Sequence, residues 1–224
     1  MKRSIITTSD GSKTIQIEDW NEQYHSIHGA IQESQHVFIK TGLHHFLTLY
    51  QPTKLSILEI GFGTGLNAFL TALEAQTLSL PIQYDGVEAY PVLSDELSQL
   101  NYASLVDSDQ QLVFDTLHQL PWEALHPIST HFSLKKRHQF FNDLEDENTF
   151  DIIYFDAFGA RVQPELWTEF IFKRMFKALK NKGVLVTYAA KGSVRRAMQA
   201  VGFVVERLEG PPGKREMLRA SKPA

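Results

Sequence analysis

Three glycines and two glutamates near an apolar run are the residues most suggestive of chemistry in this sequence. The segment 58–70 reads LEIGFGTGLNAFL and carries three glycines at alternate positions, Gly61, Gly63 and Gly65. An apolar run, a glycine turn and an apolar-periodic stretch are typical of a buried strand that leads into a helix. Glycine is needed where a side chain would keep a ligand away from the backbone. Glu59 precedes the turn and Glu88 ends the next predicted strand.

A glycine turn between a strand and a helix is typical of a nucleotide-binding site, and the residues around it indicate which nucleotide would bind. Leu66 stands where a dinucleotide fingerprint has its last glycine, and no Lys-Ser or Lys-Thr pair marks a phosphate-binding P-loop. Glu88 is placed to accept both hydroxyls of a ribose, whereas Glu59 would repel a pyrophosphate. Both carboxylates favour a cation, and the pattern therefore indicates S-adenosylmethionine. Asn67, in the first turn of the helix, is a further candidate contact.

A second group of candidate residues follows the apolar run 150–155. Asp156 ends this predicted strand, and a carboxylate there faces a ligand cleft. It can orient an acceptor amine and take up its proton, and Phe158 can pack its ring on the acceptor or the sulfonium. Asn142-Asp143, after the preceding predicted strand, stands where a side chain can meet an adenine amino group.

Charge is distributed unevenly along the 224 residues, whose formal net charge is −4. Residues 160–224 contain 14 Lys and Arg against five Asp and Glu, and such an asymmetry suggests a surface for a polyanion. The candidate phosphate contacts cluster late in the chain: Lys191, Arg195, Arg196, Lys214 and Arg215. Solvated helix faces are the alternative interpretation of these charges.

Periodicity predicts the elements that position these residues. Residues 4–18 alternate around Asp10-Gly11 and predict a hairpin, and residues 19–50 predict one or two helices. After Pro52, strands alternate with helices. Predicted strands cover 55–61, 82–89, 130–141, 150–158, 183–190, 203–210 and 214–221, and predicted helices cover 66–75, 92–100, 164–179 and 194–201. This order predicts an open, mostly parallel α/β sheet with helices on both faces and a final antiparallel hairpin. We expect residues 1–50 to form an extension packed on a domain of residues 51–224.

Several classes of protein and site are disfavoured by composition. The chain has no Cys, which excludes disulfides and thiolate metal sites, and no apolar run typical of a signal peptide or membrane span. A cytoplasmic protein is expected. His25, His28 and His36 lack a further ligand at a convincing spacing, so no metal site is predicted.

The chain resembles the methyltransferase domain of the bifunctional tRNA wobble-uridine enzyme MnmC and its free-standing relatives of the MnmD type. The matching segments occur in the same order over most of the chain: HGAIQESQHVF, EIGFGTGLN, VEAYP, FDIIYFDAFGARVQPELW, YAAKGSVRRAMQAVGF and GKREM. The resemblance implies a Rossmann-like class I methyltransferase fold and S-adenosylmethionine as cofactor. It implies conversion of 5-aminomethyl-2-thiouridine to 5-methylaminomethyl-2-thiouridine at the tRNA wobble position.

The resemblance also implies roles for individual residues. The three glycines would line the cofactor, Glu88 would hold its ribose, Asp143 would lie by the adenine, and Asp156 would orient the acceptor amine. The anticodon arm of tRNA would be the polyanionic partner. No counterpart of the family's oxidase half is seen here, so a separate oxidase or the tRNA-modifying complex would make the precursor. Two alternatives stay open: a small-molecule amine methyl- or aminopropyltransferase of the same fold, and a non-catalytic RNA-binding module.

Overall fold

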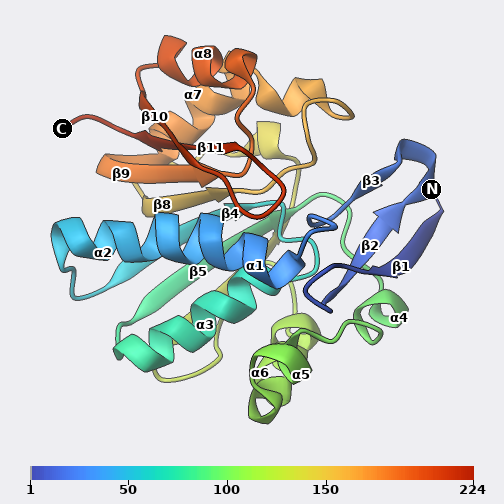
Figure 1. The fold of residues 1–224 in the computed structure, drawn as a ribbon. Coiled ribbons are helices and arrows are strands. Elements are labelled where there is room, and N and C mark those ends of the chain that lie inside the picture. The colour runs from blue at the N-terminus through green and yellow to red at the C-terminus, as the bar shows by residue number, and fades with distance from the viewer. Residues whose placement is uncertain (1) are drawn as a thin grey trace.

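Two sheets of unequal size form the framework of this computed structural model, which describes residues 2–224 (Figure 1). The smaller sheet contains β1 (Arg3–Thr7), β2 (Lys13–Ile17) and β3 (Glu22–Gln23). The larger sheet contains β4 (Leu55–Ile60), β5 (Ile82–Glu88), β6 (Leu125–Pro127), β7 (Phe132–His138), β8 (Phe150–Phe155), β9 (Leu179–Thr187), β10 (Val204–Glu209) and β11 (Glu216–Ser221). The hairpin predicted around Asp10-Gly11 is confirmed, since β1 pairs with β2 in antiparallel register.

The order of strands in the larger sheet is β10-β11-β9-β8-β4-β5-β7-β6. The central pairs β7–β5, β5–β4, β4–β8 and β8–β9 are parallel, whereas β6 and the hairpin of β10 and β11 run antiparallel at the two edges. The chain moves outward from β4 in one direction through β5 and then in the other through β8. Ligands bind at such a switch point, outside the carboxyl ends of the strands.

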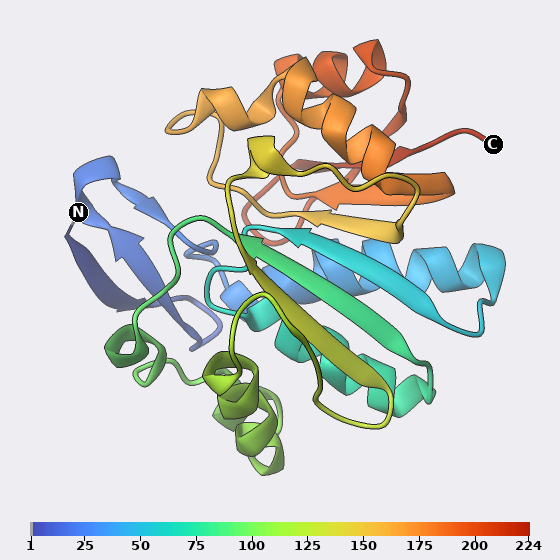
Figure 2. The same cartoon turned by 180° about the vertical axis from the view of Figure 1, so that it is seen from behind.

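Helices cover both faces of this sheet, as predicted for an α/β fold. One face carries a continuous helix of α1 (Ala30–Ser34), the π-helical η2 (Gln35–His44) and α2 (His45–Tyr50), next to α3 (Leu66–Leu78). The other face carries α7 (Glu169–Ala178) and α8 (Gly192–Ala200), which lie over the upper strands in Figure 2. The lower strands in that view are β5 and β7. They carry polar side chains at alternate positions, Gln83 and Asp85 on β5 and Lys135 and Arg137 on β7.

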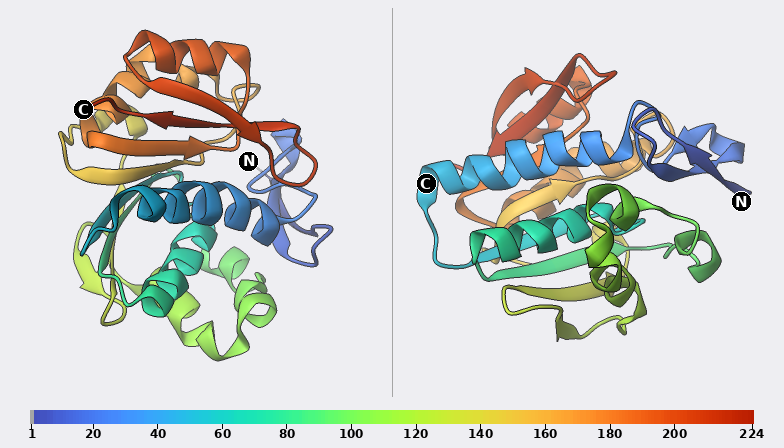
Figure 3. Two further views of the ribbon diagram at one scale, coloured as in Figure 1. Left: turned by 60° about the vertical axis from the view of Figure 1, so that its left-hand side comes forward. Right: turned by 60° about the horizontal axis from the view of Figure 1, so that its bottom comes forward.

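The remaining helical segments are short and lie around the edges of the sheet. They are α4 (Ser94–Leu97), α5 (Tyr102–Val106), α6 (Gln111–Gln119) and the 3-10 turns η1 (Glu18–Trp20), η3 (Ser108–Gln110), η4 (Phe141–Asp143) and η5 (Pro164–Trp167). In both views of Figure 3 the smaller sheet projects beyond one end of the larger sheet. The carboxyl ends of β4 and β5 point toward it (Figure 2).

Four local predictions were wrong. Residues 19–29 form the end of η1, β3 and a loop rather than a helix, and the long helix begins at Ala30. The helix predicted over 92–100 is reduced to α4, while α5 and α6 were not predicted. The helix predicted over 164–179 is broken at Thr168, whose backbone is extended (φ −97°, ψ 163°). Just before this break, the Trp167 indole N–H donates to the carbonyl of Phe158, which connects η5 to the loop after β8. The helix predicted over 194–201 begins two residues earlier, at Gly192.

The long helix 30–50 belongs to the main hydrophobic core. Val37, Phe38 and Leu43 are buried together with residues of β4, β8 and β9. Gly42 allows the closest approach, since a Cβ there would lie 2.9 Å from Cγ2 of Val186 and 3.2 Å from Cε1 of Tyr154. The first 50 residues therefore contribute a helix to the core as well as the smaller sheet, and the division of the chain at residue 50 stays a prediction.

Replacing Gly42 with alanine tests this packing. The added methyl group meets a β-branched side chain with little rotational freedom in a filled core, and this outweighs the better helix propensity of alanine. We expect Gly42→Ala to lower the free energy of unfolding by about 1–2 kcal/mol in urea titrations. Lys40→Ala, at an exposed position two residues away, is the control and should stay within about 0.5 kcal/mol. Equal stability of the two variants would contradict the packing argument.

Candidate active site

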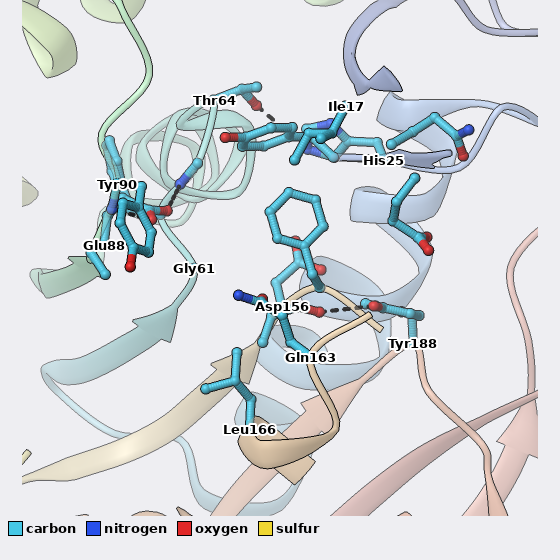
Figure 4. A pocket seen from close by; sticks show the side chains of 18 of the residues that line it. Ile17, His25, Gly61, Thr64, Glu88, Tyr90, Asp156, Gln163, Leu166 and Tyr188 are labelled. Carbon is cyan, nitrogen blue, oxygen red and sulfur yellow. Dashed lines mark hydrogen bonds between the residues drawn. The ribbon is translucent and has the colours of Figure 1, made fainter. Parts of the chain in front are cut away.

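A cavity of about 830 Å³ opens outside the carboxyl ends of β4, β5 and β8. Its floor comes from the turns that follow these strands, and its roof from the smaller sheet and the loop after β3. Figure 4 shows Asp156 near the centre, Glu88 on one side, Tyr188 on the other, and Ile17 and His25 above. Its volume lies within the range of about 300–1,000 Å³ usual for ligand pockets.

The glycine turn after β4 lets the backbone come close to two other segments. Gly61 has a φ of +89°, and a Cβ there would lie 2.6 Å from the carbonyl oxygen of Asp156. Gly63 has a φ of +49°, and a Cβ there would lie 3.1 Å from the ring of Tyr24 in the roof. Both positions combine a left-handed backbone with a close approach, which only glycine allows without strain. Gly65, with a φ of +72°, is the N-cap residue that immediately precedes α3.

Glu88 is fixed at the end of β5 by backbone donors. The N–H of Gly63 donates to Oε2 at 3.0 Å, and the N–H of Tyr90 donates to Oε1 at 2.9 Å. Each carboxylate oxygen can accept a second hydrogen bond, so the group keeps acceptor capacity toward the cavity. The turn and the carboxylate thus hold each other in place.

Asp156 and Glu59 share the side-chain amide of Asn67. Its Nδ2 donates to Oδ2 of Asp156 at 2.8 Å and to Oε1 of Glu59 at 2.9 Å. Removal from water raises the pKa of Asp156 to about 7, the Glu33 carboxylate adds to this rise, and Asn67 and Lys214 oppose it. Burial raises the pKa of Glu59 well above its usual range. Glu59 does not line the cavity, and within residues 2–224 its Oε2 has no hydrogen-bond partner.

A second acidic group lies on the far side of Asp156 from Glu88. Glu33, on α1, is 5% exposed and accepts the N–H of Ser26 at 2.8 Å. Its other carboxylate oxygen is paired with the ammonium of Lys214, from the turn between β10 and β11. That ammonium lies 3.8 Å from the centre of the Tyr188 ring, and the Tyr188 hydroxyl donates to the carbonyl of Ala157 at 2.8 Å.

Aromatic rings connect the floor of the cavity to its roof. The ring of Phe158 packs edge-on against Tyr24 and Trp20, with centroids 4.9 and 5.7 Å away. Arg161, in the same loop, donates to the carbonyls of Trp20 and Asn21 and to the Glu22 carboxylate. This side of the cavity is therefore closed by contacts between residues about 140 positions apart.

The three histidines of the N-terminal region have separate partners. His25 lines the cavity, contacts the Thr14 hydroxyl at 3.0 Å, and burial lowers its pKa to about 4. His36 contacts the carbonyl of Glu209 at 2.9 Å, and His28 is exposed beside Gly213. Within residues 2–224 no cluster of three His, Cys, Asp or Glu side chains is arranged for a metal ion. No helix in this same range is long and apolar enough to span a membrane.

The structure brings only part of the predicted site together. The residues that line the cavity are Gly61, Gly63, Asn67, Glu88, Asp156, Phe158 and Lys214. Glu59 and Gly65 lie behind the lining, and Asp143 is exposed while its neighbour Asn142 faces the cavity. The exposed or partly exposed residues Lys191, Arg195, Arg196 and Arg215 do not line it. The roles assigned to these residues stay predictions.

Sequence reasoning missed several lining residues, notably Glu33, Tyr188, Gln163 and the roof residues Trp20 and Tyr24. Glu33 could have been chosen as a candidate from the sequence, because it lies in the segment HGAIQES at the start of an apolar-periodic helix. Its partner Lys214 is 181 residues away, and nothing local in the sequence indicates that the two meet.

Residues 134–223 match a family described as S-adenosyl-L-methionine-dependent methyltransferase. Curated relatives extend the match over nearly the whole chain. The tRNA 5-methylaminomethyl-2-thiouridine biosynthesis bifunctional protein MnmC of Actinobacillus pleuropneumoniae is 29% identical over 92% of this chain and 33% of its own length. MnmC of Hydrogenovibrio crunogenus is 27% identical over 96% of this chain and 33% of its own. The chain thus spans about a third of the length of these relatives.

Solved structures resemble the fold throughout. MNMC2 from Aquifex aeolicus superposes with a TM-score of 0.76 and 25% identity, covering 100% of this chain and 72% of that one. A probable spermidine synthase from Corynebacterium glutamicum superposes with a TM-score of 0.57 and 18% identity over 98% of this chain and 76% of that one. The second likeness concerns the fold alone. The predicted Rossmann-like methyltransferase architecture is confirmed.

The raised pKa of Asp156 predicts a distinctive titration. Carbon-13 NMR of the ligand-free protein should show one carboxyl signal with a midpoint near pH 7, absent from Asp156→Asn. Because the folded state favours the protonated form, this group stabilises the fold most below about pH 4 and loses that contribution as the pH rises through about 7. The wild type should therefore lose stability relative to Asp156→Asn over this interval. A midpoint below about pH 5 would refute the enclosure of this carboxyl.

Proposed function

We propose that this chain, which belongs to the S-adenosyl-L-methionine-dependent methyltransferases and to the family of the methyltransferase part of MnmC, methylates an aminomethyl group on a tRNA wobble uridine. The acceptor would be 5-aminomethyl-2-thiouridine and the product 5-methylaminomethyl-2-thiouridine. The relatives' name supports this substrate. The observation that carries the proposal is Asp156, held at the switch point in a cavity that a glycine turn and a second carboxylate share.

The residues on the Glu88 side of the cavity fit the nucleoside part of the cofactor. Gly61 and Gly63 form a cradle that a Cβ at either position would obstruct. The Glu88 carboxylate, oriented by two backbone N–H groups, presents acceptors suited to ribose hydroxyls. When bound, S-adenosyl-L-methionine supplies a methyl group on a positively charged sulfur. A cavity lined by Glu88 and Asp156 favours that charge.

Asp156 would position the acceptor amine. Asn67 holds one carboxylate oxygen of Asp156, which fixes the direction of the group. The acceptor nitrogen must be neutral to attack, and a carboxylate with a pKa of about 7 can accept its hydrogen bond and take up a proton near neutral pH. Phe158, braced by Trp20 and Tyr24, limits where the acceptor can lie.

A basic surface near the cavity supports RNA as the carrier of the acceptor. Lys191 immediately precedes α8, only three residues after the cavity residue Tyr188, and Arg195 and Arg196 lie in the first turns of this helix. With exposed Arg215 they would contact phosphates of the anticodon arm. Because the reaction needs a preformed aminomethyl group, a separate oxidase or a tRNA-modifying complex would supply the substrate. A tRNA substrate would place the enzyme in the cytoplasm.

Labelled methyl transfer tests the proposed function directly. Bulk tRNA carrying the 5-aminomethyl precursor should accept labelled methyl from S-adenosyl-L-methionine, and nucleoside analysis should find the label in 5-methylaminomethyl-2-thiouridine. Spermidine precursors and other small amines are the control acceptors and should stay unlabelled. Label on small amines with none on tRNA would favour the small-molecule transferase instead.

Replacing Asp156 separates catalysis from cofactor binding. We expect Asp156→Ala to lower kcat/KM for the tRNA by roughly a hundredfold or more, as is typical when a proton acceptor is removed. The affinity for S-adenosylhomocysteine, measured by calorimetry, should change by less than about threefold, because the glycine cradle and Glu88 remain. Loss of both properties together would show that Asp156 acts by maintaining the fold.

Removing the basic surface should weaken RNA binding without changing the cavity. The triple variant Lys191→Ala, Arg195→Ala, Arg196→Ala should bind tRNA more weakly and reduce the slope of log affinity against log salt by up to about three. Lys173→Ala, at an exposed position of α7 in the same basic third of the chain, is the control. An unchanged salt slope in the triple variant would place the RNA on another surface.

A further inference from the structure

An ion pair lies in the cavity wall on the side away from the proposed cofactor site. Glu33 and Lys214 both line the cavity, and their side chains are 6% and 30% exposed. They come from α1 and from the turn between β10 and β11, on the Tyr188 side of Asp156 rather than the Glu88 side. The cofactor contacts proposed above leave both groups unused.

Both groups keep hydrogen-bonding capacity after pairing with each other. The Lys214 ammonium has three N–H donors, of which the Glu33 carboxylate takes one. The two Glu33 oxygens offer about four acceptor positions, of which Lys214 and the Ser26 N–H occupy two. The cavity wall therefore presents a donor next to an acceptor.

We propose that Glu33 and Lys214 recognise the acceptor base by its Watson–Crick edge, with Lys214 donating to O4 of the uracil and Glu33 accepting from its N3–H. This inference rests on the proposed function, and it identifies the residues that make the site specific for a uracil base. It gives Lys214 a role inside the cavity, in place of the phosphate contact predicted from the sequence.

Neighbouring groups on one edge of the base have complementary partners in the wall. On a 5-aminomethyluracil ring, the aminomethyl carbon, C4 with its oxygen, and N3–H follow one another along one edge. In the protein, Asp156, Lys214 and Glu33 form a connected set. Lys214 pairs with Glu33, and the charges of both act on the Asp156 carboxyl. In the proposed pose the amine lies at Asp156, O4 accepts from the Lys214 ammonium and N3–H donates to the Glu33 carboxylate.

The same pair rejects cytosine. A cytosine presents an amino group where uracil has O4, so two donors would face each other at Lys214. It presents an unprotonated N3 where uracil has N3–H, so two acceptors would face each other at Glu33. Leaving enclosed polar groups unpaired is a strong source of discrimination. Position 2 of the ring lies beyond Glu33, and this pair does not distinguish sulfur from oxygen there.

The first test changes the substrate and uses the wild-type protein. Four anticodon stem-loop RNAs carry at the wobble position 5-aminomethyl-2-thiouridine, its 2-oxo counterpart, its 3-deaza analogue with C–H in place of N3–H, or 5-aminomethylcytidine. We expect the 2-oxo RNA to be methylated within about threefold of the first. The 3-deaza RNA should lose roughly ten- to hundredfold in kcat/KM, and the cytidine RNA at least as much.

The second test changes the protein without leaving a charge unpaired. In the double variant Glu33→Gln, Lys214→Met, the ratio of kcat/KM for the uridine RNA over the cytidine RNA should fall at least tenfold. Affinity for S-adenosylhomocysteine should be unchanged. The matched control is Glu147→Gln, Lys177→Met, which removes an exposed Lys–Glu pair that does not line the cavity.

The outcomes separate this inference from the proposed function. Equal activity of the wild type on the 3-deaza RNA, or a double variant that loses rate on both RNAs with an unchanged ratio, would show that the pair only ties α1 to the β10–β11 turn. That result would overturn the inference and leave the methyltransferase function standing. Failure of the wild type to label the first RNA at all would overturn both.

Discussion

Carboxylates enclosed in one cavity are the constraint on which this site depends. Asp156 and Glu59 approach the same Asn67 amide, Glu33 adds a further negative charge, and Lys214 lies beside them as a cavity-lining cation. Burial, and after it the neighbouring negative charges, disfavours ionisation of these groups, and the raised pKa of Asp156 and of Glu59 expresses that cost. Such an arrangement is stabilised by a bound cation. A positively charged cofactor next to an amine acceptor meets this requirement, whereas a pyrophosphate would increase the repulsion.

The position of these carboxylates follows from the strand order. Because β4 and β8 are neighbours while the connections leave them in opposite directions, their carboxyl ends are left open to a ligand. Gly61 keeps this opening narrow, since it sits directly against the backbone of Asp156. The smaller sheet then closes the opening from above through Tyr24 and Trp20. Segments from the two ends of the chain complete the site around a parallel sheet that sets its geometry.

The sequence predicted the features that are local and failed where contacts are long-range. Alternating apolar strands and a glycine turn were readable because burial imposes a period on neighbouring residues, and the switch-point position of Asp156 followed from the topology. Residues 19–29 were misread because β3 and the roof loop are held by pairing with β2 and by contacts to the 158–161 loop. Helix α6 was not predicted, because only two of its residues, Phe114 and Leu117, are buried. The Glu33–Lys214 ion pair could not be predicted from local sequence patterns, because it joins positions 181 residues apart.

The uneven charge of the chain acquires a physical meaning once the cavity and the surface are considered together. Acidic groups face inward, where a cationic cofactor and an amine must meet, while Lys191, Arg195 and Arg196 lie outside on or next to a helix that begins near the same edge. Under the proposed function, an RNA backbone would be attracted to the outer surface and repelled by the cavity lining. Only a base extended from the backbone, bearing its own positive or hydrogen-bonding group, gains by entering.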